Sequence, residues 1–174
     1  MLKAQNFYIA ELAKSQIGLS YLKERQISEA TRQKFGLGYS PDNWQALEAV
    51  FGEKYSSKAL EDCGLVITKD GHRYDRFRGR VMFPIRNPRG QVIGFGARVI
   101  GKGEPKYLNS PETDIFKKGQ EVYGLWEGRE AIRKAGRAIV CEGYMDVIQL
   151  SQAGFGEAVA ALGTAIGEAH IRKL

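Results

Sequence analysis

Two carboxylates stand where a buried strand is expected to end. The run AIVCEGYMD (138–146) places Glu142 after an apolar stretch and Asp146 four positions later, in the first turn of a following helix. In open α/β sheets ligands bind at the carboxyl ends of the strands, and the helix dipole stabilises an anion at that end of a helix. Such a pair suits a hard cation such as Mg²⁺, which takes few carboxylates together with water and phosphate oxygens. A general acid/base pair or ordinary helix capping beside a solvated glutamate stays open on spacing alone.

A βαβ unit must position this pair. Apolar spacing and glycine stops predict a helix, a strand, a helix and a strand at 125–136, 137–143, 144–154 and 157–163. A strand, a helix of about ten residues and a second strand indicate parallel pairing with a right-handed crossover. Gly163 and Thr164 then share a sheet edge with Glu142. They can meet a phosphate there, or Thr164 simply caps the next helix.

The basic residues are concentrated in the middle of the chain. Net charge is +6, and the segment 69–118 has 12 Lys or Arg against 5 Asp or Glu, a net +7, so the remaining residues sum to −1. A cationic segment indicates a polyanion-binding face, because Lys and Arg neutralise phosphates and release counterions. A solvated basic surface is the other interpretation that charge allows.

Short helices precede this segment, and strands run through it. Apolar spacing predicts helices at 4–16, 19–26, 29–36, 43–52 and 58–64, with Ser28 as an N-cap and Gly36 as a stop. LVITKDGHRY predicts a strand that enters a turn at Asp70-Gly71. RGRVMFPIR (78–86) and QVIGFGARVI (91–100), joined by Asn-Pro-Arg-Gly, predict an antiparallel hairpin.

Residue alternation describes the two faces of that hairpin. Val81, Phe83 and Ile85 share an apolar face, whereas Arg78, Arg80, Met82, Pro84 and Arg86 share a face predicted to be cationic. Pro84 cannot donate to a ladder, so its strand is expected at an edge or with an irregularity. Gly94 and Gly96 let another group approach the partner strand closely. The long connection 101–124 is expected to be ordered, since it carries several large apolar side chains.

The remaining reactive residues offer little chemistry. Cys63 and Cys141 have no ligand neighbours at CxxC or CxxH spacing, so we expect no zinc site or disulfide and a reducing cytosol. Cys141 alternates away from Glu142 and is predicted to lie in the core. His170 is predicted on a helix surface. No apolar stretch approaches the roughly 18 residues of a membrane span, and the amphipathic N-terminus differs from a signal peptide.

Four stretches in this order resemble the bacterial DnaG-type DNA primases: RFRGRVMFPIRNPRGQVIGFGARV, PKYLNSPETDIFKKG, VYGLWE and IVCEGYMDVIQLSQAG. ALGTA follows at the expected place, and the resemblance spans about Ala4 to Leu174. It implies an α+β N-terminal subdomain over residues 1–124, with short helices and an antiparallel sheet. The start of an α/β Toprim domain, with its parallel βαβ unit, would follow at 125–174.

The resemblance also implies functional roles. Glu142 matches the Toprim glutamate, a catalytic acid/base or metal-site residue, and Asp146 matches another member of that acidic cluster, which holds Mg²⁺ or Mn²⁺. The residues that match a basic groove for single-stranded template, RNA–DNA hybrid and nucleotide phosphates are Arg76, Arg78, Arg80, Arg98, Lys106, Tyr107, Asn109 and Lys118. Arg98 and Lys106 are the first candidates for phosphate contacts, and Tyr107 suits stacking on a base or sugar.

The implied reaction is the synthesis of short RNA primers from ribonucleoside triphosphates on single-stranded DNA, at replication forks in the bacterial cytoplasm. Three parts of the family are not expected within these residues: the upstream zinc-binding domain, the C-terminal domain that meets the replicative helicase, and the later DxD-type aspartates of the Toprim domain. The sequence therefore predicts an incomplete catalytic core that binds nucleic acid but makes no primers alone.

Two alternatives remain. Another Toprim enzyme, a topoisomerase or a nuclease, shares the acidic strand end but is not expected to carry PKYLNSPET after a basic hairpin. A non-catalytic module that binds single-stranded nucleic acid needs only the basic groove. Salt-dependent binding tests the groove that the primase and binding-module hypotheses share.

Overall fold

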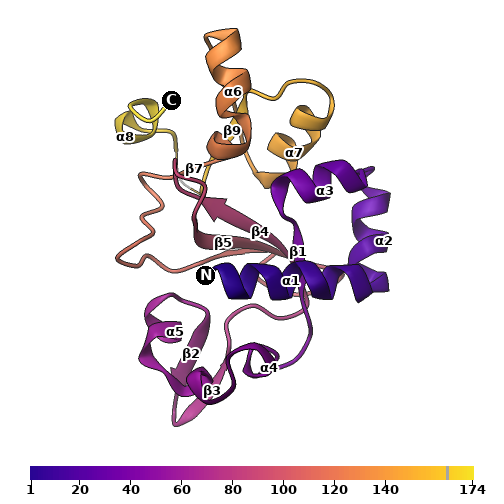
Figure 1. Cartoon of the computed structure of the whole chain (residues 1–174), viewed down its shortest axis with the longest axis vertical. Coiled ribbons are helices and arrows are strands. Elements are labelled where there is room, and N and C mark those ends of the chain that lie inside the picture. The colour runs from indigo at the N-terminus through magenta and orange to yellow at the C-terminus, as the bar shows by residue number, and fades with distance from the viewer. Residues whose placement is uncertain (164) are drawn as a thin grey trace.

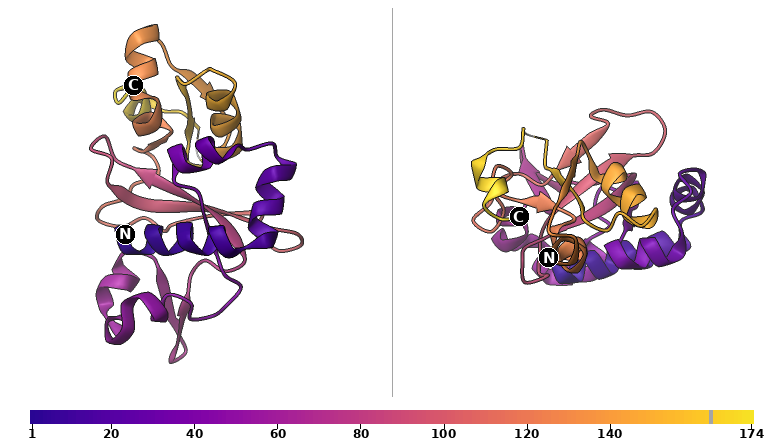
Figure 2. Two further views of the ribbon diagram at one scale, coloured as in Figure 1. Left: turned by 45° about the vertical axis from the view of Figure 1, so that its right-hand side comes forward. Right: turned by 90° about the horizontal axis from the view of Figure 1, so that it is seen from above.

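The computed structural model describes residues 1–163 and 165–174, so the contacts expected of Thr164 lie outside the described residues. Three tiers follow one another along the long axis: a lower lobe, a central sheet crossed by helix α1, and an upper βαβ unit (Figures 1 and 2). No helix in the described ranges is long and apolar enough to cross a membrane.

Three helices begin the chain: α1 (Leu2–Lys14), α2 (Gln16–Glu24) and α3 (Glu29–Phe35). Ser28 caps α3 as predicted, since its Oγ accepts a hydrogen bond from the Thr31 N–H at 3.2 Å. Gly36 ends that helix with a left-handed φ of 63°, a conformation that glycine adopts without steric cost.

The lower lobe contains α4 (Glu48–Phe51), a 3₁₀ helix η1 (Gly52–Ser56), α5 (Lys58–Asp62), β2 (Val66–Lys69) and β3 (His72–Asp75). The helix expected over 43–52 is thus largely a turn. The predicted turn at Asp70-Gly71 closes the β2–β3 hairpin with positive φ at both residues, the geometry of a two-residue hairpin turn. Buried Asp75 ties the lobe together, because its carboxylate accepts hydrogen bonds from the Leu47 N–H and the Tyr55 hydroxyl.

The central sheet has the order β1 (Gly38–Ser40), β4 (Arg80–Arg86), β5 (Val92–Val99) and β6 (Tyr107–Asn109). The predicted hairpin is therefore confirmed. Strand β1 pairs only with Arg80–Met82, so β4 is an edge where Pro84 lies, and its register shifts at Ile85/Arg86. Both features are those that a proline in a strand requires.

The hairpin face that the sequence predicted to be cationic is covered and not open to solvent. Met82 is only 1% exposed and packs with residues of α1 and the lower lobe, while Phe83 on the other face packs with the upper unit. Arg80 is buried and donates to the Pro105 carbonyl at 2.8 Å. Arg86 pairs with Glu127 of the upper unit. Arg80 and Arg86 therefore bind partners within the protein and are not available to a ligand on this face of the sheet.

The upper unit comprises β7 (Val122–Tyr123), α6 (Leu125–Ala135), β8 (Ile139–Cys141), α7 (Tyr144–Gln152), β9 (Ala158–Ala161) and α8 (Glu168–Ile171). Strands β8 and β9 pair in parallel, as predicted. Strand β7 adds an antiparallel partner to β9, which no sequence pattern indicated. The prediction for His170 is wrong: it is 2% exposed, and its Nε2 lies 3.2 Å from the Lys118 carbonyl oxygen.

Candidate functional site

A cavity of about 470 Å³ lies where β5 and β6 of the central sheet meet β8 and α7 of the upper unit. Six of the ten predicted site residues line it: Arg98, Lys106, Tyr107, Asn109, Glu142 and Asp146. These six residues are up to 48 positions apart in the sequence. The tertiary fold brings their side chains to one cavity.

Glu142 and Asp146 form the acidic wall of the cavity, at the start of α7. Glu142 follows β8 and is exposed, and Gly143 makes the turn into the helix. Asp146 Oδ2 accepts a hydrogen bond from the Gly143 N–H at 3.0 Å, so this carboxylate does cap its helix. Capping and facing the cavity are compatible, because a carboxylate has several acceptor positions.

Glu142 and Asp146 could supply two of the ligands that a divalent cation needs. Both line one cavity, and the described residues hold no group of three or more His, Cys, Asp or Glu that could bind a metal ion. Mg²⁺ is commonly held by one or two carboxylates, with water and phosphate oxygens completing its shell. Glu142 and Asp146 match that mode of binding.

Arg98, near the end of β5, and Lys106, directly before β6, form the cationic wall of the cavity. Arg98 and Tyr107 are register partners across the two strands. The Arg98 guanidinium lies over the Tyr107 ring at 5.8 Å and over the Tyr21 ring at 4.8 Å. Arg98 makes no ion pair with any residue in the described ranges, so its charge is available to a ligand.

Asn109 joins the two walls. Its Oδ1 accepts a hydrogen bond from the Tyr144 hydroxyl at 2.7 Å, and its Nδ2 donates to the Leu162 carbonyl at 3.3 Å. Arg76, a predicted site residue outside the cavity lining, donates to the Asn109 carbonyl at 3.0 Å. Arg76 therefore contributes by holding β6 in place.

Tyr144 completes the floor of the cavity. Its ring stacks on Phe83 with centroids 5.0 Å apart, and burial raises the pKa of its hydroxyl. Gly96 of β5 lies beneath this ring, and a Cβ added there would lie 2.2 Å from Tyr144 Cζ. The glycine thus allows the close approach that the sequence predicted, and the approaching group is a side chain of the upper unit.

Replacing Gly96 with alanine is therefore expected to displace Tyr144 and to lower the free energy of unfolding by about 1–3 kcal/mol, the usual cost of overpacking. Gly119→Ala is the matched control, because a Cβ there meets nothing within 4 Å. Urea denaturation of both variants measures the difference. Equal stability of the two would show that the Tyr144 ring yields freely.

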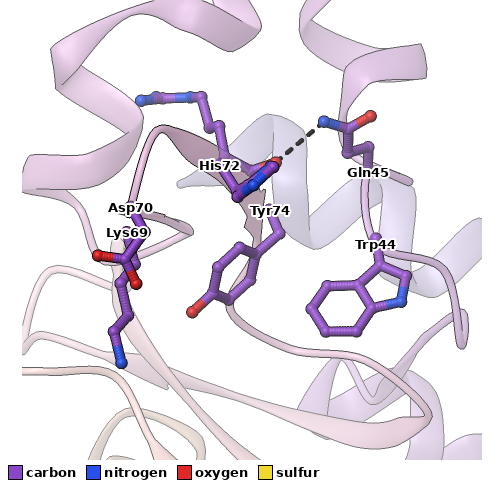
Figure 3. A pocket seen from close by; sticks show the side chains of 7 residues that line it. Trp44, Gln45, Lys69, Asp70, His72 and Tyr74 are labelled. Atoms are coloured by element: carbon purple, nitrogen blue, oxygen red, sulfur yellow. Dashed lines mark hydrogen bonds between the residues drawn. The ribbon is translucent and has the colours of Figure 1, made fainter.

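The other predicted residues lie elsewhere. The Arg78 guanidinium stands over Trp44 at 4.1 Å and over Tyr74 at 5.2 Å in the lower lobe. Trp44, which is 62% exposed, and Tyr74 belong to a second cavity of about 500 Å³, and their rings lie side by side in Figure 3. Arg80 is buried as described above. The Lys118 carbonyl lies beside His170 of α8, and the Lys118 backbone N–H donates to Glu112.

Sequence reasoning missed the part of the cavity that α2 supplies. Tyr21 and Arg25 line it, one helical turn apart. Such (i, i+4) residues share a helix face, but nothing in the sequence pairs that face with a strand end more than seventy positions away. Gln152 of α7 holds the same region: its amide accepts from the Ser28 N–H and donates to the Gln26 carbonyl, both at 2.8 Å.

Cys141 takes no part in the cavity described above. It packs against the core, and its Sγ lies 3.3 Å from the Val159 carbonyl oxygen. Burial, together with the nearby Asp146 carboxylate, raises the pKa of the Cys141 thiol to about 11. A thiol with that pKa is mostly protonated at neutral pH. Cys141 is only partly buried and lines a pocket with Glu142 and Asp146, so the predicted core position is confirmed only in part.

Comparison with known protein families matches both parts of the chain. Residues 7–129 match the family "DNA primase catalytic core, N-terminal domain", and residues 136–174 match the Toprim domain. The DNA primase of Neisseria meningitidis serogroup B is 53% identical over 169 residues, covering 97% of this chain and 28% of that protein. The DNA primase of Escherichia coli K12 is 49% identical over 156 residues, covering 88% and 27%. The chain thus spans roughly a quarter of the length of these relatives.

Solved structures show the same fold. A DNA primase domain from Pseudomonas aeruginosa superposes with a TM-score of 0.91 at 49% identity, covering 98% of this chain and 55% of that one. A DnaG primase catalytic domain bound to single-stranded DNA gives 0.89 at 45% identity, covering 97% and 56%. The RNA polymerase domain of Mycobacterium tuberculosis DnaG, in complex with a double-stranded DNA oligomer with a 6-nucleotide overhang, gives 0.90 at 36%, covering 98% and 55%.

Proposed function

Because this chain belongs to the DNA primase catalytic-core family, we propose that it forms part of an enzyme that makes short RNA primers from ribonucleoside triphosphates on single-stranded DNA. The observation that carries the proposal is the cavity in which Arg98 and Lys106 face Glu142 and Asp146. Cations opposite carboxylates suit a triphosphate accompanied by a divalent cation.

The residues of the cavity have separate tasks in this proposal. Arg98 and Lys106 bind phosphate oxygens of the nucleotide or of the template backbone, and Tyr107, which is 41% exposed, stacks on a base or sugar. Asn109 keeps the two walls at a constant separation through Tyr144 and Leu162.

Glu142 and Asp146 would hold Mg²⁺ or Mn²⁺, which when bound supplies charge neutralisation at the triphosphate. Glu142 follows β8 and lines the cavity, in reach of a ligand there, and is the catalytic carboxylate in this proposal. Asp146 is held by the Gly143 N–H and so keeps a constant orientation. In this proposal Glu142 meets the reacting group, whereas Asp146 is held in one orientation.

The lower lobe extends the path of the template. Arg78 lies over Trp44 and Tyr74, forming an exposed aromatic surface with a positive charge. Bases stack on such rings without regard to sequence, while arginine adds attraction to the backbone. In this proposal Arg78 binds nucleic acid at a surface separate from the cavity.

The organisation of the whole enzyme follows the same proposal. We propose that the N-terminal subdomain covers residues 1–124 and that the Toprim domain begins at 125, although β7 (Val122–Tyr123) already pairs with β9 of the upper unit. The replicative helicase, the RNA–DNA hybrid and a cytoplasmic location at the replication fork belong to the complete enzyme. The present chain, which spans about a quarter of the length of its curated relatives, is expected to bind nucleic acid and to make no primers by itself.

Binding of a fluorescein-labelled oligothymidylate at several salt concentrations tests the proposal. The affinity is expected to fall linearly on a double-logarithmic plot, with a slope of about −0.7 for each phosphate neutralised. Mn²⁺ binding to the chain without nucleotide, followed by electron paramagnetic resonance, tests Glu142 and Asp146, and the double substitution Glu142→Gln, Asp146→Asn is expected to abolish it. Absent or salt-independent oligonucleotide binding would contradict the proposed function.

A further inference from the structure

We infer that Tyr21 is a positioning residue that holds the Arg98 guanidinium in the cavity through the face of its ring. This inference rests on the proposed function, since it assigns to α2 a task in binding the phosphate-bearing ligand. The geometry that suggests it is the position of the Arg98 guanidinium, 4.8 Å from the centre of the Tyr21 ring.

Arg98 needs such a support. Its guanidinium has no carboxylate partner among the residues described, and a free arginine side chain has about 2 kcal/mol of rotamer entropy to lose on binding a ligand. Aromatic faces attract a guanidinium without neutralising its charge. They also leave its N–H groups free to donate to phosphate oxygens, which a carboxylate partner would not.

Tyr21 is the fixed member of the pair of rings around Arg98. It is 8% exposed and belongs to the core cluster that also contains Tyr144, whereas Tyr107 is 41% exposed. The α2 helix that carries Tyr21 is followed by the loop that Gln152 clamps with two hydrogen bonds. The position of the Tyr21 ring is thus linked to α7, the helix that carries Asp146.

The ring and not the hydroxyl accounts for this role. The Tyr21 hydroxyl is buried and finds no hydrogen-bond partner in the described residues, although Arg25 lies near, 5.5 Å over the ring. A buried hydroxyl without a partner lowers stability, because it loses its hydrogen bonds to water and gains none. Phenylalanine at position 21 should therefore hold the Arg98 guanidinium as well as tyrosine does.

Oligothymidylate binding by four variants tests the inference. Tyr21→Phe is expected to bind within twofold of the wild type, and Tyr21→Leu about 3- to 10-fold more weakly. Tyr8→Leu is the matched control: Tyr8 is 2% exposed with an unpartnered hydroxyl, but it lies in the other core cluster, away from Arg98. Replacing Tyr21 with pentafluorophenylalanine keeps the ring and reverses its charge distribution, so it should weaken binding even if Tyr21→Leu fails to fold.

A double-mutant cycle separates positioning from general damage to the fold. In an Arg98→Ala background, Tyr21→Leu is expected to cause no further loss, because its effect passes through Arg98. An equal loss in both backgrounds, or wild-type affinity of the pentafluorophenylalanine variant, would overturn the role of Tyr21 and leave the proposed function standing. A wild-type chain that does not bind the oligonucleotide would overturn both.

Discussion

Arg98→Ala is expected to weaken the binding of single-stranded DNA by about tenfold or more at low salt. Hydrogen bonds from a guanidinium to phosphate are charge-assisted, and each contributes about 1.5–3 kcal/mol. Arg98 lines the cavity and has no ion-pair partner in the described ranges, so its removal subtracts directly from the interaction with the ligand. The slope of log K against log salt should become shallower by about 0.7.

Two further variants sharpen the measurement. Arg98→Lys keeps the charge but loses the planar fork, and its affinity should fall between those of the wild type and the alanine variant. Arg129→Ala removes an exposed arginine that also lies over an aromatic ring, Trp126 at 3.7 Å, but outside the cavity. If Arg129→Ala weakens binding as much as Arg98→Ala does, binding depends on total charge and the cavity assignment is wrong.

Arg86→Met is expected to destabilise the chain by about 3–5 kcal/mol at neutral pH, since it leaves a buried carboxylate without its cation. Arg86 and Glu127 join the central sheet to the upper unit, and their side chains are only 12% and 4% exposed. Replacing both residues, as in Arg86→Met with Glu127→Leu, removes the two charges together and should recover most of the loss.

The loss of stability caused by Arg86→Met should be smaller at low pH than at neutral pH. Burial raises the pKa of Glu127, and the Arg86 guanidinium opposes that rise. Between the ordinary pKa and the raised pKa, the native chain keeps a proton that the unfolded chain has released, so stability falls as the pH increases. Without Arg86 the native pKa rises further, and this window extends to higher pH.

Urea denaturation near pH 7.5 and near pH 5 measures both effects. The gap between Arg86→Met and the wild type should narrow at the lower pH, where protonation removes the buried charge of Glu127. Arg133→Met is the control, because its ion pair with Glu130 is 80% and 68% exposed and so contributes little. A gap that is small, or that widens at low pH, would contradict the role assigned to this buried pair.

Local patterns were sufficient to predict several of the elements and the first part of the site, but not the strands β1, β6 and β7. The βαβ unit, the hairpin of β4 and β5, the cap at Ser28 and the stop at Gly36 all follow from periodicity and turn chemistry within a few residues. The place of Glu142 and Asp146 at a strand end also follows, because the carboxyl ends of parallel strands share one edge of a sheet.

Only the tertiary structure decided which cations reach that edge. Arg80 and Arg98 belong to the same hairpin but lie on its opposite faces, because the register partner of Arg98 is Val81 and not Arg80. Arg80 donates to the Pro105 carbonyl, whereas Arg98 lines the cavity. Their difference depends on what covers each part of the sheet. Tyr21 reaches Arg98 from a helix 77 positions earlier in the chain, through contacts that no periodicity encodes. The sequence by itself determined the position of the two carboxylates at a strand end, because that position depends on residues close in the chain. Only the fold determined which cations face them, because burial and packing between distant segments decide which side chains line the cavity.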